Sequence, residues 1–285
     1  REVARRHGEW RLAAEARHAR ERAQESSARE RDFLREEIRD LEALAFTPEG
    51  FLSYPTHTWS LRWFRAIARY PEFIDAFIAS LWLGLLSSAI AVALSVPAAL
   101  AIARHRFPGR EAITALFLSP LMIPHVVLGI AFLRFFTEIG LGGTFTGLVI
   151  SHIVIVLPFA LRLVLASAAG MDRAIENAAI SLGASGFTTF RRVPLPLIAP
   201  GVASGWALAF IQSFDEVTMT VFIASPGTPT LPVRMFLYIQ DNIDPLVTSV
   251  SACVIAITVV FMVVLDRLYG IERLLAGRTI RGDNA

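Results

Sequence analysis

The chain has 285 residues, of which 54% are hydrophobic, and its formal net charge is only +2, which gives no sign of nucleic-acid binding. The single cysteine, Cys253, excludes an intramolecular disulfide and a cysteine metal cluster. All 27 basic residues are arginine, so the chain lacks the lysine of a P-loop and any lysine for Schiff-base chemistry. Any ATP hydrolysis that drives this protein must therefore take place on another polypeptide.

The first 45 residues differ in composition from the rest of the chain. Residues 1–42 contain 11 arginines and 11 acidic residues, which is typical of a solvated helix and not of a signal peptide. Apolar residues recur there at helical spacing: Leu34, Ile38, Leu41 and Ala45. We therefore expect residues 1–45 to form a separate charged helical segment whose end lies on a surface or pairs with another helix. An aromatic- and proline-rich segment follows at 46–75.

Five apolar stretches are long enough to cross a bilayer, which takes about 20 residues. They are expected at 76–103, 112–136, 145–169, 197–223 and 246–265. Charged residues are scarce within them: Arg162, Asp215 and Glu216, with Arg134 near an end. This pattern predicts an all-α, polytopic bundle of membrane-spanning helices.

Arginines are concentrated beside the loops 104–111 and 170–196 and in the tail 268–285. The other two connections carry few: Arg134 and Arg234. The positive-inside rule therefore places those two loops and the C-terminus in the cytoplasm. The segment 46–75 is then extracytoplasmic, and its aromatic residues suit an interfacial belt: Trp59, Trp63, Phe64 and Tyr70.

The segment 172–196 lies between two of the predicted spans. Asp172 is a helix N-cap residue type, and Glu176 places negative charge near the positive end of that helix. Gly183 is expected to end the helix in a left-handed turn. A second turn, 186–192, is then stopped by prolines. This short polar helix-turn-helix has too little apolar surface to form a domain, so we expect it to dock onto another protein.

The spacing within this segment resembles the EAA loop of ABC importer permeases: Glu-Ala-Ala, three residues, Gly, nine residues, an aliphatic residue, any residue, and Leu-Pro. The matching residues are Asn177, Ala178, Ala179, Gly183, Val193, Leu195 and Pro196. Asn177 stands where the family has glutamate, and Glu176 precedes it. The resemblance implies that these residues, with Asp172 and Glu176, couple the chain to an ATPase. An ordinary cytoplasmic loop is the alternative.

The resemblance extends over about residues 46–270 and is closest to permeases for spermidine and putrescine. It rests on 48–51, 60–64, 123–130, His152 with 157–159, 213–216, 225–227 and 231–232. It implies a type I ABC importer transmembrane domain at 76–267 in the bacterial inner membrane. Such permeases have six spans, and the first would precede Phe46, where this chain has its charged segment.

The same resemblance implies the partners of the chain. These are an ABC ATPase dimer, a second permease subunit that is expected to be a different chain, an extracytoplasmic solute-binding protein and membrane lipids. ATP and Mg²⁺ would bind the ATPase, so this chain is expected to be a transport subunit with no cofactor of its own and no enzymatic activity. The solute is expected to be a small cation, a polyamine such as putrescine or spermidine. Permeases for iron, thiamine and similar solutes share much of the pattern and remain an alternative.

Asp215 and Glu216 are the residues most suited to handle a cation. A carboxylate inside a span is costly, so it normally faces protein, water or a cation. Adjacent helical residues point about 100° apart, so we expect only one of the two to face the pathway. In the structural alternative, one carboxylate pairs with Arg162 or caps a neighbouring backbone group.

The predicted span that contains these carboxylates also carries two residue stripes. Trp206, Phe210 and Phe214 recur every four residues and form either packing or a lining of the pathway. Gly201 and Gly205 allow another helix to approach closely.

His125 and His152 do not form a metal motif and are expected to be satisfied interior histidines. Arg162 is expected to reach the membrane surface or pair with an acidic group. Several prolines interrupt the apolar stretches and can kink the helices: Pro97, Pro120, Pro124 and Pro158.

Three other classes of protein remain as alternatives. A secondary transporter is expected to show an internal repeat or coupling-ion residues, and no clear repeat is present. An intramembrane enzyme needs a catalytic constellation, and no pair of catalytic residues supports one. A passive scaffold that anchors another subunit would show no dependence on a solute.

Overall fold

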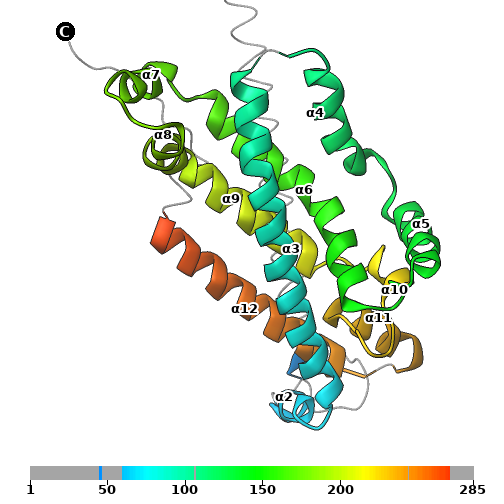
Figure 1. The fold of residues 1–285 in the computed structure, drawn as a ribbon. Coiled ribbons are helices and arrows are strands. Elements are labelled where there is room, and N and C mark those ends of the chain that lie inside the picture. Colours follow the sequence, from blue (N-terminus) through cyan, green and yellow to red (C-terminus); the bar gives the residue numbers. More distant parts are fainter. Residues whose placement is uncertain (1–44, 47–59, 106, 243, 270–285) are drawn as a thin grey trace, which may run out of the picture. The chain divides into compact units, whose positions relative to one another are not determined.

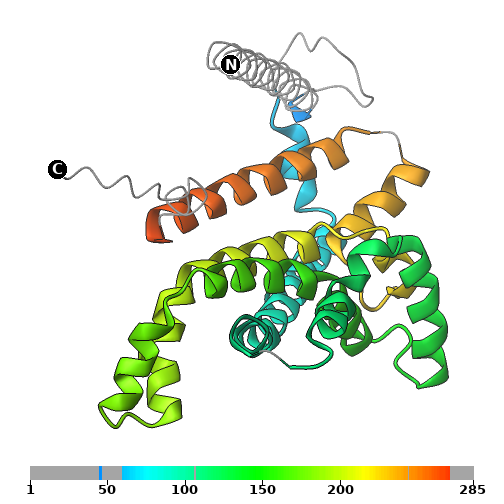
Figure 2. The ribbon, with the colours of Figure 1, turned by 90° about the horizontal axis from the view of Figure 1, so that it is seen from above.

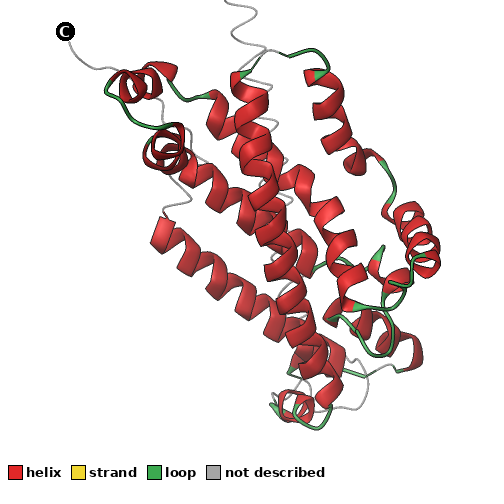
Figure 3. Ribbon diagram, viewed as in Figure 1, coloured by secondary structure: helices red, strands yellow, loops and turns green. Residues whose placement is uncertain are grey.

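The computed structural model describes residues 45–46, 60–105, 107–242 and 244–269. Within these ranges every regular element is helical and no strand occurs (Figure 3), which confirms the all-α prediction. The chain divides into two compact units, residues 1–69 with 243–255, and 70–242 with 256–285. The charged segment predicted before Ala45 and most of the predicted C-terminal tail lie outside the described residues.

The second unit is built on α3 (Pro71–Arg104). Pro71 begins this helix at a position where its missing N–H has no partner to lose, and Glu72 lies near the positive end of the helix dipole. The buried face of α3 is rich in small residues: Ser80, Gly84, Ser87, Ala91 and Ser95. Small side chains let the backbones of neighbouring helices approach one another closely.

Two further apolar helices, α6 (Phe145–Ala169) and α9 (Pro194–Phe214), pack against α3 and against each other (Figures 1 and 2). The Thr144 hydroxyl caps α6 by accepting a hydrogen bond from the Gly147 N–H at 3.1 Å. Pro158 lies inside α6 without ending it. These three helices form the core of the unit.

Two glycines of α9 lie directly against α6. A Cβ built on Gly201 would lie 2.4 Å from the Cβ of Ser167, and one on Gly205 would lie 3.2 Å from the Ala160 carbonyl oxygen. Any larger residue at Gly201 must therefore push the two helices apart. The close helix approach predicted from this glycine spacing is confirmed.

The span predicted at 112–136 is not one straight helix. It consists of α4 (Arg110–Leu118), the 3₁₀ turn η1 (Ser119–Met122) and α5 (His125–Glu138), and the helical axes before and after the break differ by 101°. Pro120 and Pro124 account for the break, because proline lacks a backbone donor and disfavours a helical residue before it. Hydropathy alone could not show this bend.

The span predicted at 197–223 also ends early. Helix α9 stops at Phe214, and only the short helix α10 (Thr220–Ile223) follows before α11 (Leu231–Asp241). Glu216 accounts for the stop, since its side chain accepts a hydrogen bond from the backbone N–H of Met219. This side-chain bond replaces a helical one.

Helices α3 and α6 run in the same direction, as expected for the first and third of the predicted spans. Arg104 at the end of α3 pairs with Glu176 of α7 (Arg173–Ser181), and α7 begins shortly after α6 ends. The two helix ends are therefore neighbours, and the chain between them must cross back. The bent pair α4–α5 makes this crossing, as Figure 1 shows.

The described part of the chain thus has three helices long and apolar enough to cross a membrane alone, and four if the bent pair α4–α5 counts as one span. The first four of the five predicted spans correspond to these elements. The last predicted span falls in α12 (Leu246–Tyr269), whose apolar stretch in the described residues, Leu246–Val260, is shorter than the other spans.

The described part of the first unit comprises α2 (Arg62–Ile67) and the start of α12. Trp63 is buried, and the rings of Phe46 and Phe64 lie 4.9 Å apart. The Ser249 hydroxyl donates a hydrogen bond to the Ala45 carbonyl at 3.0 Å. These contacts join the residues around Ala45 to the beginning of α12.

Candidate functional site

Helix α7, the first helix of the predicted coupling loop, begins and ends as its sequence predicts. The Asp172 carboxylate accepts a hydrogen bond from the Ala174 N–H at 2.8 Å and caps the N-terminus. At the other end Gly183 has a φ of 85°, and the Ala184 N–H donates to the Ala179 carbonyl at 3.1 Å. A Cβ would strain this left-handed turn, so glycine is the residue that fits it.

Helix α8 (Gly186–Arg192) is capped by the Ser185 hydroxyl and is joined almost directly to α9. Val193 is the one residue between α8 and Pro194, the first residue of α9. The predicted proline stop is confirmed, but Leu195 and Pro196 lie in the first turn of α9 and not in the loop. Proline is tolerated there because first-turn N–H groups have no helical partner. Only Val193 therefore separates α8 from the apolar helix α9.

The outer side of α7 and α8 exposes large apolar side chains. They are Ile175, Ile180, Leu182 and Phe187, with exposed fractions of 50%, 53%, 89% and 74%. Asn177, Ala178 and Gly183 are exposed beside them, and Ala179 is half-buried. Clustered apolar side chains on an otherwise polar loop are typical of a surface that contacts another protein.

An ion pair ties α7 to the end of α3. The Arg104 guanidinium contacts the Glu176 carboxylate, and both side chains are largely buried, with exposed fractions of 14% and 21%. Arg104 also lies 3.7 Å from the Met171 sulfur. The pair fixes the position of α7 relative to a membrane-spanning helix. No local sequence pattern predicts this pair, because 72 positions separate the two residues.

The two carboxylates after α9 have different surroundings. Asp215 is exposed, whereas Glu216 is buried, with an exposed fraction of 7%. Glu216 Oε2 lies 2.7 Å from His125 Nδ1, and Oε1 accepts the Met219 N–H at 2.7 Å. Arg162 is exposed on α6. Of the two structural roles predicted for a carboxylate here, pairing with Arg162 and capping of a backbone group, the cap is observed, and Glu216 makes it. The second partner of Glu216 is His125.

The aromatic stripe of α9 forms as predicted and packs against α3. The Trp206 and Phe210 rings, and the Phe210 and Phe214 rings, lie 5.9 Å apart, and Phe214 also lies 5.8 Å from Phe77. A Cβ on Gly84 would lie 3.0 Å from the Phe210 ring. Phe210 therefore fills the space that this glycine leaves. The contacts account for Phe210 and Phe214 as packing, and a role in lining the pathway stays a prediction.

His152 of α6 lies in a fully buried chain of hydrogen bonds. Its Nδ1 is 2.8 Å from the Ser213 hydroxyl and its Nε2 is 3.0 Å from the Thr220 hydroxyl. The Ser213 hydroxyl is 2.9 Å from that of Ser87, which donates to the Leu83 carbonyl. The prediction of a satisfied interior histidine is confirmed for His152.

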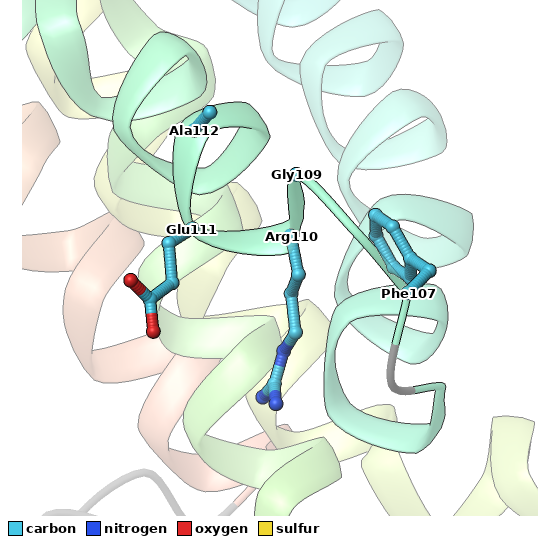
Figure 4. A pocket seen from close by; sticks show the side chains of 5 residues that line it. All are labelled: Phe107, Gly109, Arg110, Glu111 and Ala112. Atoms are coloured by element: carbon cyan, nitrogen blue, oxygen red, sulfur yellow. The ribbon is translucent and has the colours of Figure 1, made fainter.

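An open pocket lies at the loop between α3 and α4 (Figure 4). Phe107, Gly109, Arg110, Glu111 and Ala112 line it. The side chains of Arg110 and Glu111 extend from the first turn of α4. Because α3 ends here, the pocket belongs to the end of the unit near α7, far from the α10 end where Glu216 lies (Figure 1). It therefore does not combine with the two carboxylates into one site.

Residues 72–272 match a family described as "binding-protein-dependent transport system inner membrane component". The match covers well over half of the chain. The chain belongs to this family. It is therefore a multi-pass inner-membrane permease, and ATP hydrolysis takes place on a separate subunit. The resemblance to ABC importer permeases drawn from the EAA-like spacing is confirmed.

Two curated relatives of this permease are named for different transport systems. It is 29% identical over 217 residues to the spermidine/putrescine transport system permease protein PotC of Haemophilus influenzae, covering 76% of this chain and 83% of the relative. It is 34% identical over 197 residues to the putative 2-aminoethylphosphonate transport system permease protein PhnV of Salmonella paratyphi A, covering 68% and 74%.

Solved structures show the same fold. A bacterial alginate ABC transporter in complex with an alginate pentasaccharide-bound periplasmic protein matches with a TM-score of 0.64 and 19% identity, over 86% of this chain and 90% of that one. The MetNI methionine ABC transporter matches with a TM-score of 0.57 and 18% identity, over 69% and 94%. The predicted architecture of an ABC importer transmembrane domain is confirmed by these likenesses.

Proposed function

We propose that this permease forms the translocation pathway for a small solute with an aliphatic ammonium group, in first place a polyamine such as putrescine or spermidine. The observation that carries the proposal is a shared group: putrescine, spermidine and 2-aminoethylphosphonate, named for the relatives, all contain a primary amine. Asp215 is the residue suited to meet it, because its carboxylate is exposed whereas that of Glu216 is already bonded.

The α7–α8 loop is the proposed contact with the ATPase. Its exposed apolar side chains supply a docking surface, and the residues of the EAA-like spacing lie on it or at the start of α9. The Arg104–Glu176 pair joins this loop to α3, and Val193 joins it to α9. A push on the loop is thus passed to two core helices, which is what alternating access between inward- and outward-open states requires.

The proposed assembly contains an ATPase dimer that binds ATP and Mg²⁺, a second permease subunit, and a solute-binding protein on the outer side. The arginine distribution orients the chain with the loops 104–111 and 170–196 and the C-terminus in the cytoplasm. Asp215, at the other end of α9, then lies toward the side from which the binding protein delivers solute.

An aminoalkylphosphonate is the second candidate solute, because the relative named for 2-aminoethylphosphonate has the higher identity of the two, 34% against 29%. This solute shares the ammonium group but also carries negative charge. An exposed carboxylate repels that charge, so Asp215 favours a polyamine.

Uptake into proteoliposomes tests the proposal. The complete transporter is reconstituted with ATP inside and binding protein outside, and labelled putrescine, spermidine and 2-aminoethylphosphonate are compared. Uptake that needs both ATP and binding protein and that only polyamines inhibit supports the first candidate. Uptake of the phosphonate alone moves the assignment to the second. ATP hydrolysis with no uptake of any amine overturns the amine proposal.

A further inference from the structure

Two interruptions of membrane helices meet in the second unit. One lies between η1 and α5, directly before His125, and the other is the stretch 215–219 between α9 and α10. Helix α5 packs against this second break: a Cβ on Gly129 would lie 2.8 Å from the Phe222 ring and 3.0 Å from the Met219 carbonyl. Discontinuous helices in transporters occur where the pathway opens and closes.

The His125–Glu216 contact joins the two interruptions. Because a carboxylate only accepts, the 2.7 Å contact means that His125 Nδ1–H donates to Glu216 Oε2. Glu216 Oε1 accepts from the Met219 backbone, so both oxygens of this buried carboxylate have donors. A hydrogen bond to a charged, desolvated acceptor is among the stronger kinds, and losing it leaves that charge short of a partner.

The other side of the α9–α10 break is held in a different way. The Ser87 hydroxyl donates its hydrogen bond to the Leu83 carbonyl, so its oxygen accepts a hydrogen bond from the Ser213 hydroxyl. Ser213 must then accept from His152 Nδ1–H, and His152 Nε2 accepts from the Thr220 hydroxyl. Each donor in this series of hydrogen bonds therefore has a defined acceptor. His152 connects residues before and after the break, and the whole chain is buried.

The two histidines therefore differ in how easily they can move. His152 has an exposed fraction of 0% and lies on α6, inside the three-helix core. The His125 side chain is 29% exposed and lies on α5, which buries only Gly129 and Phe136 within the described residues. Helix α5 packs against α10 near Gly129, and within the described residues its charged contact with another element is the one between His125 and Glu216.

We propose that His125 and Glu216 form a latch that holds α5 against the α9–α10 break in the resting permease and opens during each transport cycle. His152 with Ser213 and Thr220 is the fixed side, against which α5 moves. This proposal rests on the proposed coupling to a separate ATPase, but it does not depend on which solute is carried. In it, His125 is a positioning residue for α5, and Glu216 is its anchor.

The test measures ATP hydrolysis by the complete transporter in proteoliposomes without binding protein or solute. H125A removes the donor, so the open state becomes more populated and basal hydrolysis rises about tenfold. H125N retains a side-chain N–H at the position of the histidine Nδ1 and stays within about twofold of the unaltered protein. R134A is the matched control, because it removes an exposed ion pair with Glu138 from the same helix and leaves basal hydrolysis unchanged.

Unchanged basal hydrolysis in H125A would overturn the latch, and so would an equal rise in H125A and H125N. If H125A does not assemble with the ATPase, E216Q is measured in its place, and failure of both variants to assemble assigns the pair to folding instead. The readout uses no solute. Absent amine uptake by the unaltered transporter therefore counts against the proposed function and leaves the result for the latch intact.

Discussion

At the scale of single residues, Asp215 and Glu216 show how neighbours in sequence acquire different roles. Glu216 is turned inward and bonded twice, whereas Asp215 is exposed beside it. D215N keeps the size of the side chain and removes its charge. We expect it to raise the KM for putrescine uptake about tenfold, as loss of one charge-assisted contact does.

The control for this prediction is D241N, which removes an exposed carboxylate at the end of α11. Initial rates of uptake over a range of putrescine concentrations give KM and maximal rate for both variants. An unchanged KM in D215N, with transport otherwise intact, would remove Asp215 from the solute pathway.

At the scale of elements, Gly183 decides how the coupling loop turns. Its φ is 85°, and within the described part of the chain nothing lies within 4 Å of a Cβ built on it. G183L therefore strains the turn by about 1 kcal/mol and adds bulk only to the proposed ATPase surface. We expect the variant to remain in the membrane while ATP hydrolysis is no longer stimulated by binding protein and uptake falls by at least about tenfold.

Gly109 provides a matched control for the strain, because it also has a φ of 85° and open space around its Cβ position. G109L imposes the same backbone cost in the loop between α3 and α4 and should retain coupling. Equal loss of coupling in both variants would attribute the effect to strain alone. Normal coupling in G183L would exclude the α7–α8 loop as a rigid lever.

The sequence predicted those elements whose signals are local. The ends of α7 follow from Asp172 and Gly183, and the close approach of α9 to α6 follows from the spacing of Gly201 and Gly205. The bend before α5 lies at Pro120 and Pro124, which the sequence predicts as sites of a kink, but its size of 101° was not predicted. The early end of α9 was missed because it depends on one side-chain cap.

The missed contacts are all long-range. His125 and Glu216 lie 91 positions apart, His152 and Ser213 lie 61 apart, and Arg104 and Glu176 lie 72 apart. A single sequence contains no signal for such pairs, because each member looks like an isolated polar residue in or beside an apolar stretch. Their partners follow only from the packing of α3, α6 and α9, which brings distant segments together.

At the scale of the whole molecule, the orientation of the permease decides whether its parts can work together. Helix α9 connects the α7–α8 loop to the α10–α11 region, so one crossing separates Ser185 from Asn242, and both are exposed. The arginines around 170–196 predict that Ser185 lies in the cytoplasm. With Cys253 replaced by serine, S185C should react with an impermeant maleimide only in inside-out vesicles, and N242C only in intact spheroplasts.

Each result constrains the mechanism beyond topology. Reaction in the expected pattern places the exposed apolar side chains of α7 and α8 where a cytoplasmic ATPase can reach them, and places Asp215 toward the solute-binding protein. The reverse pattern would put the α7–α8 loop outside the cell, where no ATPase can contact it, and coupling through Gly183 would be impossible. Reaction of both cysteines from one side would show that α9 does not cross the membrane, and the pathway along it would have to be abandoned.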